Sequence, residues 1–211
     1  MHLHPLDFKH WLTGDSGSLS YGEAFDRHLL ASALTLAYFD ADTALDLGLG
    51  LSRRQLAALA MRHFPQAAPV LAARLSDGDG ARPLSLEEPD LRALLLDHRA
   101  VDAPEEAWLA HIIARRALRP NHLWQDLGLP LRDDLSRLME RHFPALAARN
   151  SGEMKWKKFF YRELCGLEGV LICKSPVCES CGDFSSCFGG EDGPSLLARA
   201  ALFPTPETRS C

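Results

Sequence analysis

LGLGLSRRQLAALAMRHFP at residues 47–65 and LGLPLRDDLSRLMERHFP at residues 127–144 are two versions of one pattern. They share an Arg-His-Phe-Pro ending, differ in length by one residue, and repeat their apolar residues at the spacing of one helix face. Each also follows an apolar stretch, at residues 29–39 in the first case and 108–118 in the second. The pattern predicts two related helical hairpins packed about a pseudo-twofold axis. The alternative is a chance similarity between two leucine-rich helices.

The composition of the whole chain agrees with a helical protein. The chain has 211 residues, 46% of them hydrophobic and 24% charged, which is ordinary for a globular protein with one sizeable core. Ala, Leu and Arg dominate, and β-branched residues are scarce. We therefore predict an all-α fold with two pseudo-repeated helical hairpins and a C-terminal cysteine-rich cluster-binding loop. The formal net charge of -5 argues against nonspecific nucleic-acid binding as the main activity, so no nucleic-acid partner is expected.

Capping residues and prolines place the helix boundaries. Ser20 and Ser52 are predicted to begin two helices, and Pro104 lies in the first turn of a third. Asn150, with Glu153 three residues later, resembles a capping box for another. Helices are expected at residues 20–39, 52–64, 87–97, 102–118, 131–142, 152–165 and 194–203.

A single helical domain, residues 1–211, is expected, and its parts follow from these helices. The parts are a flexible segment (1–19), the first hairpin (20–75), a loop (76–86), the second hairpin (87–150), a basic helix with the cysteine-rich metal-binding segment (151–190), and a C-terminal helix and tail (191–211).

Four cysteines lie close together in the stretch CKSPVCESCGDFSSC, residues 173–187. Cys173, Cys178, Cys181 and Cys187 have the spacing C-x4-C-x2-C-x5-C, and four thiolates within fifteen residues can surround one inorganic centre. Disulfides are the alternative. No signal peptide is recognised at the N-terminus, and the longest nearly unbroken apolar stretch, residues 29–39, is far shorter than the ~20 residues that cross a bilayer. A cytoplasmic protein without a membrane partner is expected, and clustered cysteines in a reducing cytosol indicate a metal site.

The spacing of the cysteines admits two kinds of metal site. Structural zinc sites commonly use two short ligand pairs, and here only Cys178 and Cys181 form such a pair. The run C-x4-C-x2-C matches the first three ligands of plant-type iron–sulfur proteins, although the fourth ligand here follows at once. The spacing favours an iron–sulfur cluster, and zinc remains the alternative.

Several other residues are candidates for binding the metal or for binding a partner beside it. Cys165 could be a reserve ligand or a buried apolar residue. The basic side chains that precede it could form an electropositive collar for an anion or an acidic partner, or could extend past a buried aromatic face. His63 and His142 are expected to have structural roles at helix ends, and two further histidines are weaker candidates for metal ligands. The basic side chains are Lys155, Lys157, Lys158 and Arg162, and the two weaker candidates are His111 and His122.

Four stretches of the sequence together resemble one known family. They are HLWQDLGLP (122–130), RHFPALAARN (141–150), MKWKKFFYRELC (154–165) and the four-cysteine motif ending in CFGGE. In combination they resemble the NifQ family of nitrogen fixation, closely over the second half of the chain and loosely over the first.

The resemblance implies a carrier rather than an enzyme. It implies a molybdenum–iron–sulfur cluster, formed on an iron–sulfur precursor and held by Cys173, Cys178, Cys181 and Cys187. It further implies delivery of molybdenum to the NifEN scaffold and the nitrogenase iron protein (NifH) for the iron–molybdenum cofactor of nitrogenase. The residues alone argue only for a thiolate-rich metal centre. An electron-transfer protein and an interaction module with structural zinc are the alternatives, and the sequence contains no P-loop, dinucleotide, HExxH or nucleophile-elbow motif.

Overall fold

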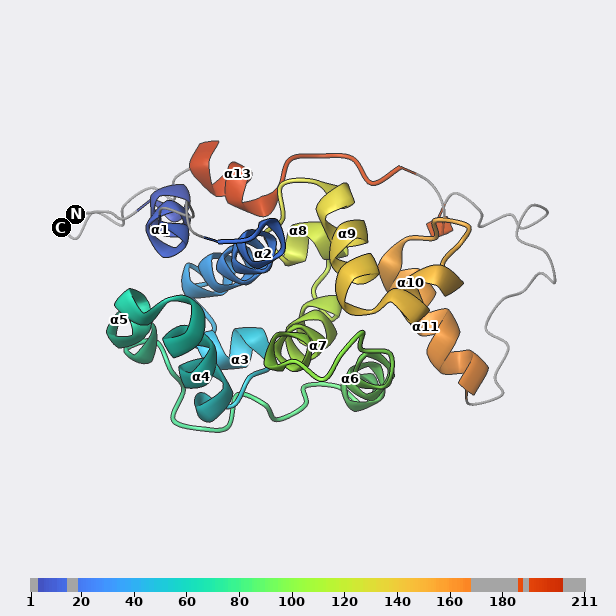
Figure 1. Ribbon diagram of the computed structural model, residues 1–211, viewed down its shortest axis with the longest axis horizontal. Helices are drawn as coiled ribbons and strands as arrows, with labels where there is room; N and C mark the ends of the chain where they lie inside the picture. Colours follow the sequence, from blue (N-terminus) through green and yellow to red (C-terminus); the bar gives the residue numbers. More distant parts are fainter. Residues whose placement is uncertain (1–3, 15–18, 168–185, 188–189, 203–211) are drawn as a thin grey trace.

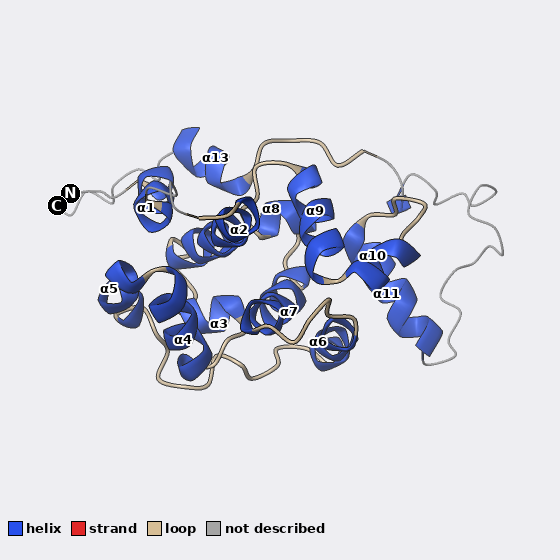
Figure 2. Ribbon diagram, viewed as in Figure 1, coloured by secondary structure: helices blue, strands red, loops and turns tan. Residues whose placement is uncertain are grey.

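The computed structural model describes residues 4–14, 19–167, 186–187 and 190–202, and all regular structure in these ranges is helical (Figures 1 and 2). The prediction of an all-α fold is therefore confirmed. None of the described helices is both long and apolar enough to span a membrane. The elements are α1 (Pro5–Thr13), α2 (Tyr21–Tyr38), α3 (Leu45–Leu49), α4 (Arg53–His63), the 3-10 helix η1 (Pro65–Ala67), α5 (Ala68–Ala72), α6 (Glu87–Asp97), α7 (Pro104–Ala117), α8 (Leu123–Asp126), α9 (Arg132–His142), α10 (Pro144–Arg149), α11 (Trp156–Leu167) and α13 (Leu196–Leu202).

Helices α2 and α7 supply much of the core, and the shorter helices pack around them (Figure 1). Leu30 and Leu34 of α2 and Ile112 and Ile113 of α7 are fully buried. The predicted starts of α2 and α4 are confirmed by two capping boxes. In the first, Ser20 Oγ accepts from the backbone N–H of Glu23, and in the second Ser52 Oγ accepts from that of Gln55.

The N-terminal segment differs from the prediction. The sequence predicts a flexible segment over residues 1–19, but residues 5–13 form helix α1. Phe8 and Leu12 on one face of α1 are fully buried, and Phe8 stacks on Tyr38 with ring centroids 4.5 Å apart. His4 also has a role, since its Nδ1 accepts a hydrogen bond from Leu6 N at 3.3 Å. The helix is held by contacts with residues distant in sequence, which its local sequence does not reveal.

The start of α11 also differs from the prediction. The helix begins at Trp156, and the expected capping box of Asn150 and Glu153 does not form. Asn150 instead accepts from Met154 N and donates to Met154 O, both at 2.9 Å, while Glu153 has a positive φ of 54°. The side chain of Asn150 therefore closes a turn before the helix, because both of its polar groups are used by Met154.

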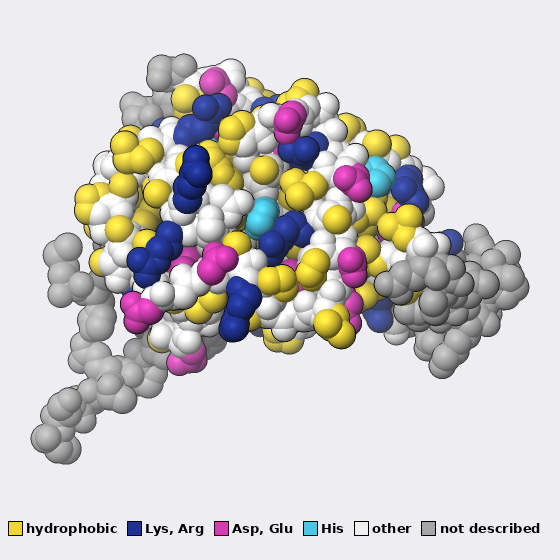
Figure 3. All heavy atoms as spheres, turned by 90° about the horizontal axis from the view of Figure 1, so that it is seen from below, with side chains coloured by type: hydrophobic (Ala, Val, Ile, Leu, Met, Phe, Trp, Pro, Cys, Tyr) yellow, Lys and Arg dark blue, Asp and Glu magenta, His cyan; other side chains and the backbone are white. Residues whose placement is uncertain are grey.

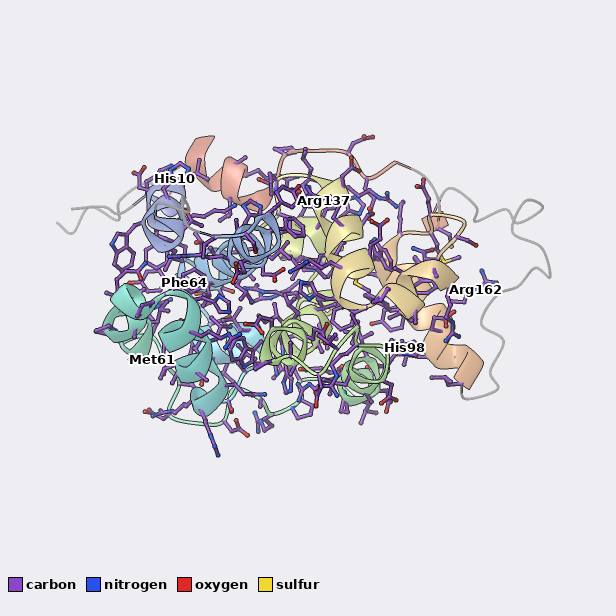
Figure 4. All side chains as sticks on the ribbon, in the orientation of Figure 1. His10, Met61, Phe64, His98, Arg137 and Arg162 are labelled. Carbon is purple, nitrogen blue, oxygen red and sulfur yellow. The ribbon has the colours of Figure 1, made fainter. Side chains whose placement is uncertain are left out.

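The two similar sequence stretches share several local geometries. Phe64 and Phe143, which follow α4 and α9, have φ/ψ of -139°/52° and -137°/52°; Figure 4 labels Phe64. Gly50 and Gly128, which precede these helices, have φ of 68° and 70°, a conformation that favours glycine. The pseudo-twofold relation between two whole hairpins stays a prediction.

The Arg-His sequences that end α4 and α9 each bind a carboxylate from the half of the chain that carries the other sequence. Arg62 and His63 of α4 bind Glu105 in the first turn of α7, and the His63 Nε2 to Glu105 Oε1 distance is 3.0 Å. Arg141 and His142 of α9 bind Asp26 of α2 at 2.7 and 2.9 Å. Helix α4 thus contacts a carboxylate of α7, and α9 contacts a carboxylate of α2.

Candidate metal centre

One of the four cysteines of the predicted metal site, Cys187, lies within the described residues. Its side chain is half-buried and packs against the hydrophobic core. Its carbonyl oxygen accepts a hydrogen bond of 2.8 Å from Lys155 N, directly before the first residue of α11. Cys173, Cys178 and Cys181 lie outside the described residues. The structure therefore describes the protein frame that borders the cysteine-rich segment.

Glu191 fixes the chain that follows Cys187. The side chain of Glu191 is 5% exposed, and its carboxylate contacts two side chains, with Oε1 3.0 Å from His122 Nδ1 and Oε2 2.8 Å from Arg132 Nε. Gln125 Nε2 also donates to Pro194 O at 3.0 Å. Residues 191–194 are thereby attached to α8, α9 and the residue before α8. Glu191 was not predicted from the sequence, because nothing local distinguishes this glutamate from an exposed one.

Helix α11 borders the cysteine-rich segment on its N-terminal side. Trp156, Phe159 and Phe160 on one face are buried, which agrees with the interpretation that basic side chains extend past a buried aromatic face. Trp156 packs edge-on against Phe159 with ring centroids 5.7 Å apart. Its other face carries Lys158 and Arg162, which are both exposed; Figure 4 labels Arg162. Cys165 lies on this helix, half-buried and without a disulfide. Its role as a reserve ligand stays a prediction.

The predicted electropositive collar is wrong for Lys157. Its Nζ donates to Asn121 O at 2.7 Å and to Asp126 Oδ2 at 2.6 Å, and it also contacts Arg119 O. Burial lowers the pKa of Lys157 below its ordinary value, and the hydrogen bond to Asp126 raises it in part. Lys157 therefore joins α11 to the chain around α8 and is not presented to a partner.

We expect the substitution Lys157→Met to lower the free energy of unfolding by about 3 kcal/mol, because it leaves the buried carboxylate of Asp126 without its cation. Lys158→Met is the matched control, since Lys158 is exposed on the same helix, and it should change stability by less than about 0.5 kcal/mol. Urea unfolding followed by circular dichroism measures both. Equal effects of the two substitutions would contradict a structural role for Lys157.

The four histidines considered from the sequence make contacts that join parts of the fold. His63 and His142 bind Glu105 and Asp26, which agrees with the structural role expected for both, although the sequence pointed to the helix dipole and not to these carboxylates. His111 Nδ1 lies 2.9 Å from Gly50 O, and its burial lowers the pKa of the ring below its ordinary value although that hydrogen bond raises it. His122, a weak ligand candidate, binds Glu191. No group of three or more His, Cys, Asp or Glu side chains suited to a metal ion occurs in the described parts of the chain.

Charges of both signs mix on the surface of the protein. On the face shown in Figure 3, Lys and Arg side chains are interspersed with Asp and Glu. That face therefore presents no large patch of one charge sign among the described residues.

A comparison with protein families matches the NifQ family model to residues 29–189, which include all four clustered cysteines. The chain belongs to the NifQ family. It is 41% identical over 175 residues to Protein NifQ of Azotobacter vinelandii, covering 78% of this chain and 89% of that protein. It is 43% identical over 175 residues to the NifQ homolog of Sinorhizobium fredii, covering 81% and 75%, and 37% identical over 171 residues to Protein NifQ of Klebsiella pneumoniae, covering 74% and 94%. No solved structure matches the chain.

Proposed function

We propose that this NifQ-family chain carries molybdenum on an iron–sulfur cluster and donates it for the biosynthesis of the iron–molybdenum cofactor of nitrogenase. The observation that carries the proposal is the family match, which extends through the four-cysteine motif. Membership of the family implies molybdenum donation by a carrier, not catalysis. The cluster and its ligands are the finer part of the proposal.

The donor set fits an iron–sulfur cluster. Cys173, Cys178, Cys181 and Cys187 would hold it, since thiolates are soft ligands that suit iron–sulfur assemblies. The cluster, when bound, would supply sulfides that bind molybdenum. Cys187 supports this assignment, because its carbonyl is fixed at the start of α11 and Glu191 fixes the chain just beyond it. A ligand position held from both sides keeps one corner of a cluster in place.

Donation requires that at least one bond between a metal of the cluster and its ligand can be exchanged. Either one metal lacks a permanent cysteine, or one of the four cysteines leaves during transfer. The proposed acceptors are the NifEN scaffold and the nitrogenase iron protein (NifH). The exposed face of α11 lies beside the cysteine-rich segment in sequence and carries Lys158 and Arg162, so we assign docking of an acidic acceptor surface to this face.

The test begins with protein purified without oxygen and analysed for molybdenum, iron and zinc, together with its electron paramagnetic resonance spectrum. Iron with molybdenum, followed by loss of molybdenum to NifEN that lacks it, is the expected result. Zinc alone, with no iron regained on anaerobic reconstitution, would leave a structural module. Reversible redox cycling in which the protein never releases molybdenum to the acceptor would point to electron transfer.

A further inference from the structure

Two consecutive arginines at the end of α7 are equally buried but differ in their partners. Arg115 and Arg116 are each 3% exposed. Arg115 donates to Glu88 Oε1 at 2.9 Å and to Arg82 O at 2.7 Å. The Nε and Nη2 atoms of Arg116 have no hydrogen-bond partner among the described residues. Buried N–H groups without an acceptor cost free energy unless a ligand or water supplies one.

Arg116 lines a cavity of about 370 Å³ between α1, α2, the end of α7, α8 and α13. A water molecule occupies about 30 Å³, so the cavity has room for a small polyatomic anion with some of its hydration. Much of the wall is apolar, and apolar walls strengthen the attraction between an anion and a guanidinium. The apolar lining consists of Pro5, Leu36, Phe39, Pro120, Leu196 and Leu197.

The charges around this cavity leave Arg116 as a cation without a carboxylate of its own. Asp40 and Asp126 are the two acidic residues in the lining. Asp40 Oδ2 binds Arg119 Nη2 at 2.5 Å, and Asp126 Oδ2 binds Lys157 Nζ at 2.6 Å. Burial, and then the nearby charge of Arg119, lower the pKa of Arg116 to about 10. The nearby charges of Asp126 and Asp40 raise this pKa in part, and Arg116 stays charged at neutral pH. The two cations and two carboxylates of the lining balance, and Lys157, which binds Asp126 from outside the lining, adds one positive charge beside the cavity.

We propose that this cavity binds a small tetrahedral oxyanion, with the guanidinium of Arg116 as the buried cation of its lining and Arg119 as a second cation on the more exposed side. A guanidinium presents its donors as a planar fork that matches two oxygens of such an anion. The choice of molybdate within this class rests on the proposed function, because molybdate is the oxyanion of the metal that the chain would carry.

The cavity and the candidate metal centre are joined through the start of α11. Lys157 binds Asp126 of the cavity wall and the carbonyl of Asn121, which also lines it. Two residues earlier, Lys155 N binds the carbonyl of Cys187. An oxyanion at Arg116 would therefore lie against the same frame that holds Cys187. This arrangement suits a site that binds the metal as an oxyanion before the thiolates bind it.

Titration calorimetry of the full chain with sodium molybdate, sodium sulfate and sodium phosphate at low ionic strength tests the proposal. We expect saturable binding, and Arg116→Gln should weaken it about 10- to 100-fold, since a hydrogen bond to a charged group is lost. Arg54→Gln is the matched control, because it removes the same charge from an exposed position outside this cavity, and it should leave binding unchanged.

Absence of binding by all three anions, or equal binding by the wild-type chain and Arg116→Gln, would overturn the site. Binding of sulfate or phosphate with rejection of molybdate would overturn the choice of molybdate. Thermal unfolding provides a second readout, since a bound anion should raise the melting temperature of the wild-type chain and not that of Arg116→Gln. A cooperative unfolding transition of Arg116→Gln also shows that this variant is folded, so its weaker binding reports the loss of the guanidinium.

The substitution Cys181→Ala separates this inference from the proposed function. It should abolish cluster binding and leave oxyanion binding intact. Arg116→Gln should do the reverse, so that the iron content after reconstitution stays at the wild-type level while molybdenum uptake from molybdate falls. Loss of iron in Arg116→Gln would show that Arg116 supports the cluster and would overturn a separate oxyanion site.

Discussion

Cys181→Ala is expected to remove nearly all bound iron and molybdenum while leaving the helical content of the protein unchanged. The reason is that the four thiolates act as one ligand set, and a cluster held by three of them loses a corner. The buried core, by contrast, is formed by side chains of α1 to α11 that pack on one another, and Cys181 lies outside the described residues. Metal analysis and circular dichroism on the same anaerobic preparation measure both parts of the prediction.

Cys165→Ala is the matched control for this experiment. It also removes one thiol, but from the half-buried position on α11, and it should keep the iron and molybdenum of the wild-type chain. Equal metal loss in both variants would mean that the ligand set of the proposal is incomplete. Unfolding of the whole chain by Cys181→Ala would indicate a structural centre and count against a carrier.

The sequence predicted those features of the fold that depend on short-range interactions. The N-caps Ser20 and Ser52 can be recognised because each bonds a residue three positions later. The burial of Trp156, Phe159 and Phe160 and the exposure of Lys158 and Arg162 on α11 follow from helical spacing, whereas the partners of Lys157 do not. Similarly, four thiolates grouped within a short segment indicate a metal site whatever the surrounding fold.

The features that could not be predicted depend on residues far apart in the chain. Glu191 lies 59 residues from Arg132, and Asp126 lies 31 residues from Lys157. No pattern in a single sequence shows that these groups meet, because the pairing is set by the packing of α8, α9 and α11. The same holds for Arg116, whose Nε and Nη2 have no hydrogen-bond partner among the described residues because of the helices that surround it. The cysteines therefore predict a candidate site, but the contacts of the residues that border it could not be predicted.

Asp26→Asn is expected to produce the largest loss of stability in the hairpin core, about 3 kcal/mol at pH 7. Asp26 accepts hydrogen bonds from His142 Nε2 at 2.9 Å and from Arg141 Nε at 2.7 Å. The substitution keeps the shape of the side chain and removes its charge, so Arg141 loses its counter-ion and His142 loses a charged hydrogen-bond partner. Urea unfolding of the two proteins measures the difference.

The effect of Asp26→Asn should depend on pH. Burial alone would raise the pKa of Asp26, but the hydrogen bonds from His142 and Arg141 outweigh it and lower the pKa from 3.8 to about 2. A lowered pKa in the folded state stabilises the protein above the unfolded value, and this contribution is lost as the pH falls. The stability difference between wild type and Asp26→Asn should therefore be constant above about pH 5 and shrink between about pH 4 and pH 2, by about 2 kcal/mol. A constant difference down to about pH 3 would contradict the ion pair.

Glu105→Gln tests whether the carboxylate bound by the end of α4 contributes as much to the free energy of unfolding as the carboxylate bound by the end of α9. Glu105 occupies the corresponding position beside Arg62 and His63, but Arg62 is 58% exposed whereas Arg141 is 43% exposed. His63 is also more exposed than His142. Since solvent weakens ion pairs, the loss for Glu105→Gln should be about half that for Asp26→Asn. Glu105 of α7 is bound by α4, and Asp26 of α2 is bound by α9, so either substitution should lower the cooperative stability of both halves of the chain together. Separate unfolding of one half of the chain in either variant would show that these contacts do not couple the two halves.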